Sequence, residues 1–340
     1  MKIVVLINVF LILANIVFFS KAEYFAKLFE LYDKPDNIRK IHTTSVPLLG
    51  GISLFLTISV NLFTFFVLEI ISLEIFLVYF ISIFSFFVLG LIDDYKNINP
   101  KVKLSFSIIF LTIFFLFFNS FVIYELSFSS FSKIVSLGIF SIPFTILCFM
   151  LLQNAINMID GVDGLLSITS ISILIICLIY NSNSVIFFKY LIISTILNLV
   201  IFLIFNFKKK TFMGDSGTFA IAILISLIIV DTYNQESISF FNVSLKVEQI
   251  FLILMLPGID MFRVFLLRIS LGKNPFLPDN NHLHHYLLRF FNRYQVCLIY
   301  FFSILLSNLM INLFPGKTLM ILIITLIFYF SLLFFSYKKN

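Results

Sequence analysis

The chain has 340 residues, of which 61% are hydrophobic and only 12% are charged, and its formal net charge is +6. In soluble domains about a quarter of the residues are charged, so this composition excludes a soluble globular protein and predicts an integral membrane protein. Apolar runs recur without a polar linker, which predicts a single integral domain over residues 1–340. The three cysteines lie inside apolar runs and support neither a disulfide framework nor a zinc site.

Apolar runs long enough to cross a bilayer follow one another along the chain. Because a spanning helix needs about 20 apolar residues, we predict an all-α, polytopic membrane protein with about 11 transmembrane helices. The predicted ninth span contains Pro257, Gly258 and Asp260, so we expect this part of its backbone to face protein or a water-filled cavity. In chain order the predicted spans are Lys2–Ser20, Pro47–Leu68, Ile71–Ile92, Leu104–Phe118, Ile134–Leu152, Leu165–Tyr180, Ile186–Phe207, Gly217–Thr232, Glu248–Phe265, Val296–Phe314 and Thr318–Ser336.

The basic residues predict the direction in which the chain crosses the membrane, because Lys and Arg are retained on the cytoplasmic side. All but five of the 23 basic residues lie after odd-numbered spans or in the C-terminal tail. We therefore expect the N-terminus outside and the C-terminus in the cytoplasm. The positive net charge then reflects topology and the anionic headgroups of the lipid bilayer, and it requires no nucleic acid as a partner.

Six aspartates lie at or just inside the same cytoplasmic helix ends, where topology does not explain them. Ionisable groups at this depth are costly and usually functional. Six carboxylates on one side call for a ligand of opposite charge, and a divalent cation is the simplest choice. The six are Asp93, Asp94, Asp160, Asp163, Asp215 and Asp260.

The first pair, Asp93 and Asp94, ends the third span. Adjacent carboxylates at the C-terminus of a helix oppose its macrodipole, so another group must hold them. Mg²⁺ binding and a base with a raised pKa are both open, and a solvated helix end is the alternative.

The segment from Asn154 to Gly164 is more specific. Asn154, Asn157 and Asp160 recur at helical spacing on one face. Gly161 and Gly164 then allow the backbone to come close to a ligand. The partial likeness to a calcium loop fails because the bidentate glutamate that ends such a loop is missing, and a plain turn does not require so many Asx side chains. This segment therefore predicts a ligand site.

The start of the eighth span is the third segment of interest. Gly214, Asp215 and Ser216 follow a run of three lysines. Backbone N–H groups at the start of a helix favour phosphate, and Asp215 beside them would hold a metal that bridges to this phosphate. A role for Asp215 as a helix cap only is the alternative.

The loop after the ninth span is the longest on the cytoplasmic side and contains three of the four histidines. Histidine with arginine suits phosphate oxygens, and a histidine cluster equally suits Zn²⁺. The lack of a cysteine partner and the oxygen-rich surroundings favour Mg²⁺. The candidate site residues of the ninth span and this loop are Arg263, Arg268, Asp279, His282, His284 and His285.

In this order the segments resemble the polyprenyl-phosphate N-acetylhexosamine-1-phosphate transferase family (glycosyltransferase family 4). The likeness covers nearly the whole chain. Its last stretch looks like the branch that uses UDP-N-acetylhexosamines, since the branch that transfers phospho-MurNAc-pentapeptide carries a shorter Pro-Ile-His-His-His run. The residues that carry the resemblance are Arg39–His42, Pro47–Gly51, Asp93–Asp94, Asn154–Gly164, Gly214–Asp215 and Pro275–His285.

The resemblance implies an enzyme of the bacterial inner membrane with a cytoplasmic active site. Undecaprenyl phosphate would attack the β-phosphorus of a UDP-N-acetylhexosamine, with UDP-GlcNAc favoured, and UMP would leave. Mg²⁺ is the implied cofactor and Mn²⁺ the alternative, while direct and two-step covalent routes stay open. A homodimer is compatible with the resemblance. The peptidoglycan transferase and a multi-pass transporter are the alternative functions, although no inverted repeat of the kind found in transporters is present.

The resemblance also assigns roles to residues. Asn157 and Asp215 would hold Mg²⁺. Asp93 would act as a base or organise the lipid phosphate, with Asp94 close to the metal. The histidines and Arg268 would clamp phosphates, and Asp163 and Gly161 would face the uridine. The predicted site is Asp93, Asp94, Asp160, His282, His284 and His285 for catalysis, Arg39, Lys40, Asn154, Gly161, Asp163, Arg263, Arg268 and Asp279 for substrate binding, and Asn157 and Asp215 for the metal.

Overall fold

The computed structural model describes residues 2–33, 45–130, 134–181, 186–235, 244–274 and 280–337. Within these ranges ten helices are long and apolar enough to cross a membrane. The shorter apolar helix α7 (Leu165–Tyr180) corresponds to the remaining predicted span. The strands of the described residues form two short antiparallel pairs. The prediction of an all-α, polytopic membrane protein is confirmed, and the side on which each terminus lies stays a prediction.

The chain forms two compact units, and each unit combines an earlier and a later stretch of the sequence. The first unit consists of Met1–Phe118 and Ser184–Ile228, and the second consists of Asn119–Asn183 and Ile229–Asn340. Helix α9 (Gly214–Asn234) begins in the first unit and ends in the second. It is buried along almost its whole length.

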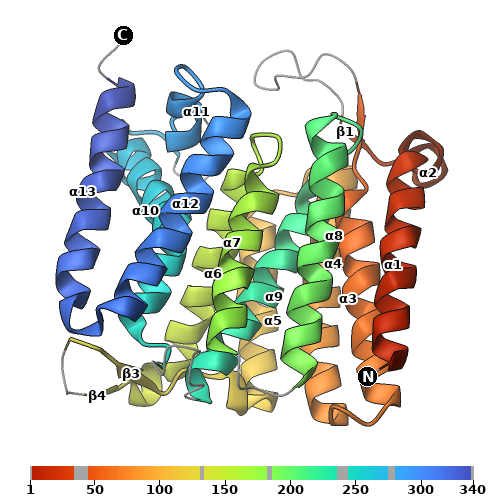
Figure 1. Ribbon diagram of the computed structural model, residues 1–340, viewed down its shortest axis with the longest axis horizontal. Helices are drawn as coiled ribbons and strands as arrows, with labels where there is room; N and C mark the ends of the chain where they lie inside the picture. Colours follow the sequence, from red (N-terminus) through yellow and green to blue (C-terminus); the bar gives the residue numbers. More distant parts are fainter. Residues whose placement is uncertain are drawn as a thin grey trace. The chain divides into compact units, whose positions relative to one another are not determined.

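The first unit is a bundle of long helices joined to one short strand pair. Its elements are α1 (Lys2–Ser20), α2 (Ala22–Phe29), β1 (Tyr32–Asp33), β2 (Val46–Pro47), α3 (Gly50–Val67), α4 (Leu73–Lys96), α5 (Pro100–Phe117), α8 (Ile186–Phe207) and the start of α9 (Figure 1). Helix α1 packs against α3 and α8, and α3 also packs against α4. The amphipathic helix α2 was absent from the predicted spans because it is too short to cross a bilayer.

Buried polar side chains join three helices of this bundle. Asn15 of α1 donates to Thr57 Oγ1 at 3.0 Å and accepts a hydrogen bond from Ser53 Oγ at 2.8 Å. Asn198 of α8 donates to both of these hydroxyl oxygens, at 2.8 and 3.0 Å. Because polar side chains within a bilayer need protein partners, this network fixes the facing sides of α1, α3 and α8.

The second unit contains the remaining helices and a β-hairpin. Helix α7 packs against α12, α10 packs against α6, α12 and α13, and α11 packs against α13. Its elements are η1 (Asn119–Phe121), β3 (Glu125–Ser127), β4 (Ile134–Ser136), η2 (Gly138–Phe140), α6 (Ser141–Ile159), α7, the end of α9, α10 (Val247–Ser270), α11 (Leu283–Leu287), α12 (Arg293–Leu313), η3 (Pro315–Lys317) and α13 (Thr318–Tyr337) (Figure 1).

Several predicted boundaries differ from the structure, and the start of the fifth span differs for a local reason. The fifth span was expected to start at Ile134, but Ile134–Ser136 pairs with Glu125–Ser127, and the helix runs over Ser141–Ile159. The β-branched residues Ile134 and Val135 suit a strand, although they also extend an apolar run. Helix α10 continues through Pro257 to Ser270, and Pro257 and Asp260 are buried, which confirms that this part of the span faces protein.

Candidate active site

The ends of three helices in the first unit bring together two carboxylates and one ammonium group. Asp93 lies in the last turn of α4, Lys103 in the first turn of α5 and Asp215 at the start of α9. The Lys103 Nζ contacts Asp93 Oδ2 and lies 3.2 Å from Asp215 Oδ2. Asp93 is buried, whereas the side chain of Asp215 is 29% exposed. The cluster is therefore accessible from the side of Asp215.

The turn between α4 and α5 places Lys103 beside Asp93. Asn97 ends α4 in the left-handed conformation, with φ of 47°. The Asn99 side chain accepts a hydrogen bond from Lys101 N, and Pro100 occupies the first position of α5. Left-handed asparagine at a helix end, an asparagine cap and proline at the first helical position are ordinary stop and start signals. The chain reverses within a few residues, so both charged side chains reach the same place.

Lys103 belongs to this cluster but is not among the site residues predicted from the sequence. In the sequence it is one of many basic residues that indicate the topology of the membrane protein. A lysine in the first turn of a helix is unfavourable, because the positive end of the macrodipole lies there. This position was a signal that one of the lysines in the first turn of α5 is compensated by a carboxylate, but it does not distinguish Lys103 from Lys101.

Asp94 has a different role from its neighbour. Its Oδ1 accepts a hydrogen bond from Asp215 N at 2.7 Å, and its Oδ2 accepts one from Ser216 N at 3.1 Å. The first N–H groups of a helix have no partner within the helix, and a carboxylate near them also complements the macrodipole. Asp94 thus supplies the cap of α9, and the carboxylate of Asp215 points to Lys103 instead. We expect Asp94 to act by holding Asp215 in place.

We expect Asp94→Ala to lower the stability of the detergent-solubilised protein by about 2–4 kcal/mol, because two hydrogen bonds to a charged acceptor are lost. A fall in Tm, measured by thermal unfolding, would show this. Glu74→Ala is a matched control: Glu74 is an exposed carboxylate in the first turn of α4. Its removal should cost less than about 1 kcal/mol. Equal values of Tm for the two variants would contradict the capping role.

The predicted segment Pro47–Gly51 also contacts the start of α9 and the residues just before it. Gly50 N donates to Phe212 O at 3.0 Å, and Gly51 N donates to Met213 O at 2.9 Å. A methyl group at Gly51 would come within 2.3 Å of Ser216 Oγ. The structure therefore brings together two segments that carried the family resemblance, and the close approach requires glycine at this position.

Helix α4 approaches the start of α9 at Gly90 as closely as Gly51 does. A methyl group there would lie 2.3 Å from Asp215 O, a backbone atom. Gly214 has φ of 75°, and a methyl group on it would lie 2.6 Å from Asp94 Oδ2. Backbone contacts thus determine where the carboxylate of Asp215 lies.

We expect Gly90→Ala to lower both Tm and turnover, since it must push α4 away from the start of α9 by several tenths of an ångström. Gly258→Ala is the control, because a methyl group at Gly258, also within a long helix, meets nothing within 4 Å. That variant should be neutral or more stable, by up to about 1 kcal/mol, as expected for alanine in a helix. Thermal unfolding of both variants in detergent measures the difference. A wild-type Tm for Gly90→Ala would contradict the close packing.

In the second unit the segment Asn154–Gly164 connects α6 to α7. Asn154 is exposed near the end of α6, Asn157 lies one turn further on, and Asp160 ends the helix. Gly164 starts α7 with φ of 83°, a conformation that favours glycine. The helical spacing predicted for this segment is therefore correct.

An ion pair ties this loop to α12. Asp163 Oδ2 accepts a hydrogen bond from Arg293 Nη1 at 2.7 Å. Both side chains are partly exposed, so the ion pair contributes little to global stability. Its consequence is local: one oxygen of the residue predicted to face the uridine is already engaged within the protein.

The histidine motif packs on the same loop. A methyl group at Gly161 would lie 3.6 Å from His284 Nε2 and 3.7 Å from His285 Cε1. The rings of His284 and His285 are 4.3 Å apart, and that of His282 stacks parallel to His284 at 5.4 Å. Two of the segments predicted from sequence, residues 154–164 and 282–285, thus form one cluster within the second unit.

His284 is fully enclosed in this cluster. It is 1% exposed, and neither of its ring nitrogens has a hydrogen-bond partner among the described residues. Burial, together with the neighbouring His285, lowers the pKa of His284 well below its usual range, so the ring is neutral at physiological pH. His284 therefore contributes a neutral N–H donor to this cluster and no positive charge.

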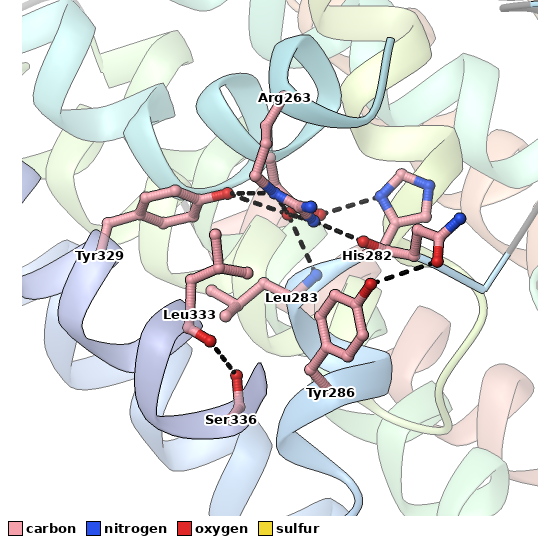
Figure 2. A network of polar contacts seen from close by, with 9 residues as sticks. Arg263, His282, Leu283, Tyr286, Tyr329, Leu333 and Ser336 are labelled. Carbon is pink, nitrogen blue, oxygen red and sulfur yellow. Dashed lines mark hydrogen bonds and ion pairs between the residues drawn. The ribbon is translucent and has the colours of Figure 1, made fainter. Parts of the chain in front are cut away.

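Arg263 and Arg268, both predicted to bind substrate, belong to α10. The Arg263 guanidinium donates to Asp260 Oδ1 at 2.7 Å and to Tyr329 OH at 3.0 Å, as Figure 2 shows. This guanidinium is thus engaged inside the protein. Arg268 is buried in the last turn of the helix.

The predicted site residues are distributed over both units. Arg39, Lys40 and Asp279 lie outside the described residues. The predicted metal ligands Asp215 and Asn157 belong to the first and the second unit, respectively. Within the described ranges, no three His, Cys, Asp or Glu side chains form a group that could hold a metal ion. The first unit contains Asp93, Asp94 and Asp215, and the second contains Asn154, Asn157, Asp160, Gly161, Asp163, Arg263, Arg268, His282, His284 and His285.

The fold and the site define a multi-pass helical membrane protein with charged and histidine-rich clusters at helix ends. Residues 75–233 match the model of glycosyl transferase family 4, and the resemblance predicted from the motifs is thereby confirmed. The matched stretch contains the whole Asp93, Lys103 and Asp215 cluster as well as the segment Asn154–Gly164.

Relatives are similar over most of the chain. The undecaprenyl-phosphate alpha-N-acetylglucosaminyl 1-phosphate transferase of Escherichia coli strain K12 is 28% identical over 312 residues, which cover 89% of this chain and 82% of that protein. The protein of the same name from Thermotoga maritima is 29% identical over 296 residues, which cover 86% and 84%. That of Salmonella typhi is 27% identical over 295 residues, which cover 84% and 76%.

Proposed function

We propose that this protein transfers N-acetylglucosamine 1-phosphate from UDP-GlcNAc to undecaprenyl phosphate, releases UMP and so starts the synthesis of a lipid-linked cell-surface polysaccharide. The names of the relatives support the lipid acceptor and the sugar phosphate. The observation that carries the proposal is the cluster of Asp93, Lys103 and Asp215 within the matched residues 75–233. The distribution of basic residues supports a reaction at the cytoplasmic face of the bacterial inner membrane.

The chemistry suits the residues of this cluster. An oxygen of the lipid phosphate forms a bond to the β-phosphorus of the donor, and the bond from that phosphorus to the oxygen of UMP breaks. Phosphoryl transfer depends mainly on positioning and on neutralising charge. Asp93 would either accept a proton from the lipid phosphate or orient this phosphate for attack. The ammonium group of Lys103 supplies positive charge to the transferred phosphoryl group.

Mg²⁺ is the proposed cofactor, with Asp215 as a protein ligand and Mn²⁺ as the alternative ion. The position of the Lys103 ammonium group supports this proposal. Carboxylate oxygens of Asp93 and Asp215 hold this positive charge, so the place is suited to a cation. Mg²⁺ is usually bound by one or two carboxylates together with substrate phosphates, so a protein site with few ligands fits this ion. When bound, it would offset the negative charge of the diphosphate.

We expect EDTA to stop the transfer of radiolabelled GlcNAc phosphate to lipid, and excess Mg²⁺ to restore it. EDTA would remove the divalent ion that is proposed to offset the negative charge of the diphosphate. The measurement is the amount of labelled lipid extracted from membranes that contain the protein. Full activity in EDTA would remove the metal from the proposal.

The donor sugar is tested with a panel of radiolabelled UDP-sugars in the presence of undecaprenyl phosphate and Mg²⁺. We expect UDP-GlcNAc to give both UMP and a labelled lipid. Membranes that convert UDP-MurNAc-pentapeptide but not UDP-GlcNAc would instead indicate the peptidoglycan enzyme. If no donor yields UMP and a lipid-linked sugar, the proposed function is wrong.

A further inference from the structure

A buried carboxylate of the second unit, Asp260, lies at the centre of a polar network around the histidine motif. It belongs to the second half of α10 and is 4% exposed. Its Oδ2 lies 2.9 Å from His282 Nδ1, and its Oδ1 accepts a hydrogen bond from Leu283 N at 3.0 Å. Leu283 is the first residue of α11, so Asp260 holds both the histidine and the start of the helix that carries the motif.

The other donors in this network all bind the same oxygen of Asp260. Tyr329 of α13 donates to Oδ1 at 3.0 Å, and Arg263 donates to Oδ1 at 2.7 Å. Arg263 also donates to Tyr329 OH and to the backbone oxygen of Asn281. In Figure 2 the guanidinium of Arg263 lies between Tyr329 and His282. Oδ1 is thus filled by three donors from α10, α11 and α13, and Oδ2 faces His282.

This arrangement determines which nitrogen of His282 carries hydrogen. An ionised carboxylate only accepts hydrogen bonds, so the short contact to Oδ2 requires hydrogen on Nδ1. Nε2, on the other side of the ring, points away from the network (Figure 2). A carboxylate behind a histidine both orients the ring and stabilises positive charge that develops on it during a reaction.

We infer that Asp260 is a positioning residue: it keeps hydrogen on Nδ1 of His282 and leaves Nε2 to bind the phosphate groups of the substrate. Arg263 and Tyr329 hold the Asp260 carboxylate in turn, which assigns Arg263 a supporting role in place of direct substrate contact. The identity of the substrate rests on the proposed transferase function. Which nitrogen of His282 carries hydrogen does not depend on that function.

The substitution Asp260→Asn separates this role from a merely structural one. The amide oxygen can keep the three hydrogen bonds from Leu283, Arg263 and Tyr329, so the fold around α11 is retained. The amide NH₂ then faces His282 Nδ1 and donates to it, which forces the hydrogen onto Nε2. Asp231→Asn is the matched control, because Asp231 at the end of α9 is half-buried and bonded to Gln235 at 2.8 Å.

The direct test is nitrogen NMR of the full-length protein labelled with ¹⁵N-histidine. The chain has only four histidines, and His282→Gln identifies the signals of His282. We expect hydrogen on Nδ1 in the wild type and in Asp231→Asn, and on Nε2 in Asp260→Asn. A wild-type ring with hydrogen on Nε2 alone overturns the inference, and this result does not depend on any variant folding. An unchanged ring in a folded Asp260→Asn protein overturns it as well.

The kinetic test uses transfer from UDP-GlcNAc. We expect Asp260→Asn to lower kcat about 100-fold or more with little change in KM, because ground-state binding is retained while the ring is wrongly protonated. The double variant Asp260→Asn/His282→Gln should be no slower than His282→Gln alone, since both changes remove one function. Losses that multiply in the double variant would overturn the inference. If the wild type transfers no sugar phosphate, the proposed function fails, and the NMR result still decides the role of Asp260.

Discussion

Asp215→Asn is expected to lower the turnover of sugar-phosphate transfer by about 1000-fold or more while the protein still inserts into membranes at wild-type levels. The amide has the shape of the carboxylate but lacks its charge. The site would therefore lose one of the two negative charges that face Lys103, and this is the charge of the proposed Mg²⁺ ligand. The backbone N–H of residue 215 would still donate to Asp94, so the start of α9 should stay in place.

Asp231→Asn on the same helix is the control for this substitution. Asp231 lies at the other end of α9, where its carboxylate accepts a hydrogen bond from Gln235. We expect wild-type turnover from this variant, measured as UMP released per unit of inserted protein. Wild-type turnover in Asp215→Asn as well would remove Asp215 from the reaction centre.

Lys103→Met is expected to lower turnover about 100-fold. Methionine keeps much of the length of the side chain but removes the only positive charge that the described residues place between Asp93 and Asp215. At an effective dielectric constant of about 20, a charge pair at 4 Å is worth about 4 kcal/mol, so the two carboxylates lose a large compensating interaction. The transferred phosphoryl group would lose the same neutralising charge.

Lys101→Met provides the comparison for Lys103. Lys101 lies in the same first turn of α5, but its side chain is exposed. It contributes to the positive charge of that helix end without a place in the cluster. We expect near wild-type turnover and normal insertion for Lys101→Met. If both lysine variants lose activity equally, the effect comes from the local charge and not from contact with Asp93 and Asp215.

The membrane-spanning helices are the part of the fold that sequence predicts best. The predicted runs Lys2–Ser20, Leu165–Tyr180 and Ile186–Phe207 coincide with α1, α7 and α8. Their apolar stretches end at polar residues, so hydropathy alone locates the helix ends. The start of α6 could not be predicted in this way, because a β-hairpin strand and a helix that follow each other can both be apolar.

The sequence singles out Asp93, Asp94 and Asp215 of the candidate site but neither Lys103 nor the contacts between these residues. Asp93 and Asp94 are adjacent in sequence and of the same type, yet one binds Lys103 and the other caps α9. Which of them faces which partner depends on how α4 is rotated against its neighbours, and a single sequence does not contain this information. Tyr329 lies in a span without charged residues, so no local pattern links it to Asp260.

The measurement that most directly tests the proposed function is the stoichiometry of the reaction in liposomes that contain the purified protein, undecaprenyl phosphate, UDP-GlcNAc and Mg²⁺. The proposed function predicts one UMP released for each GlcNAc phosphate that becomes attached to lipid, in the wild type but not in Asp215→Asn. Release of UDP instead of UMP would contradict it, because the bond broken would then lie between the sugar and the diphosphate. No nucleotide release under these conditions would contradict it equally.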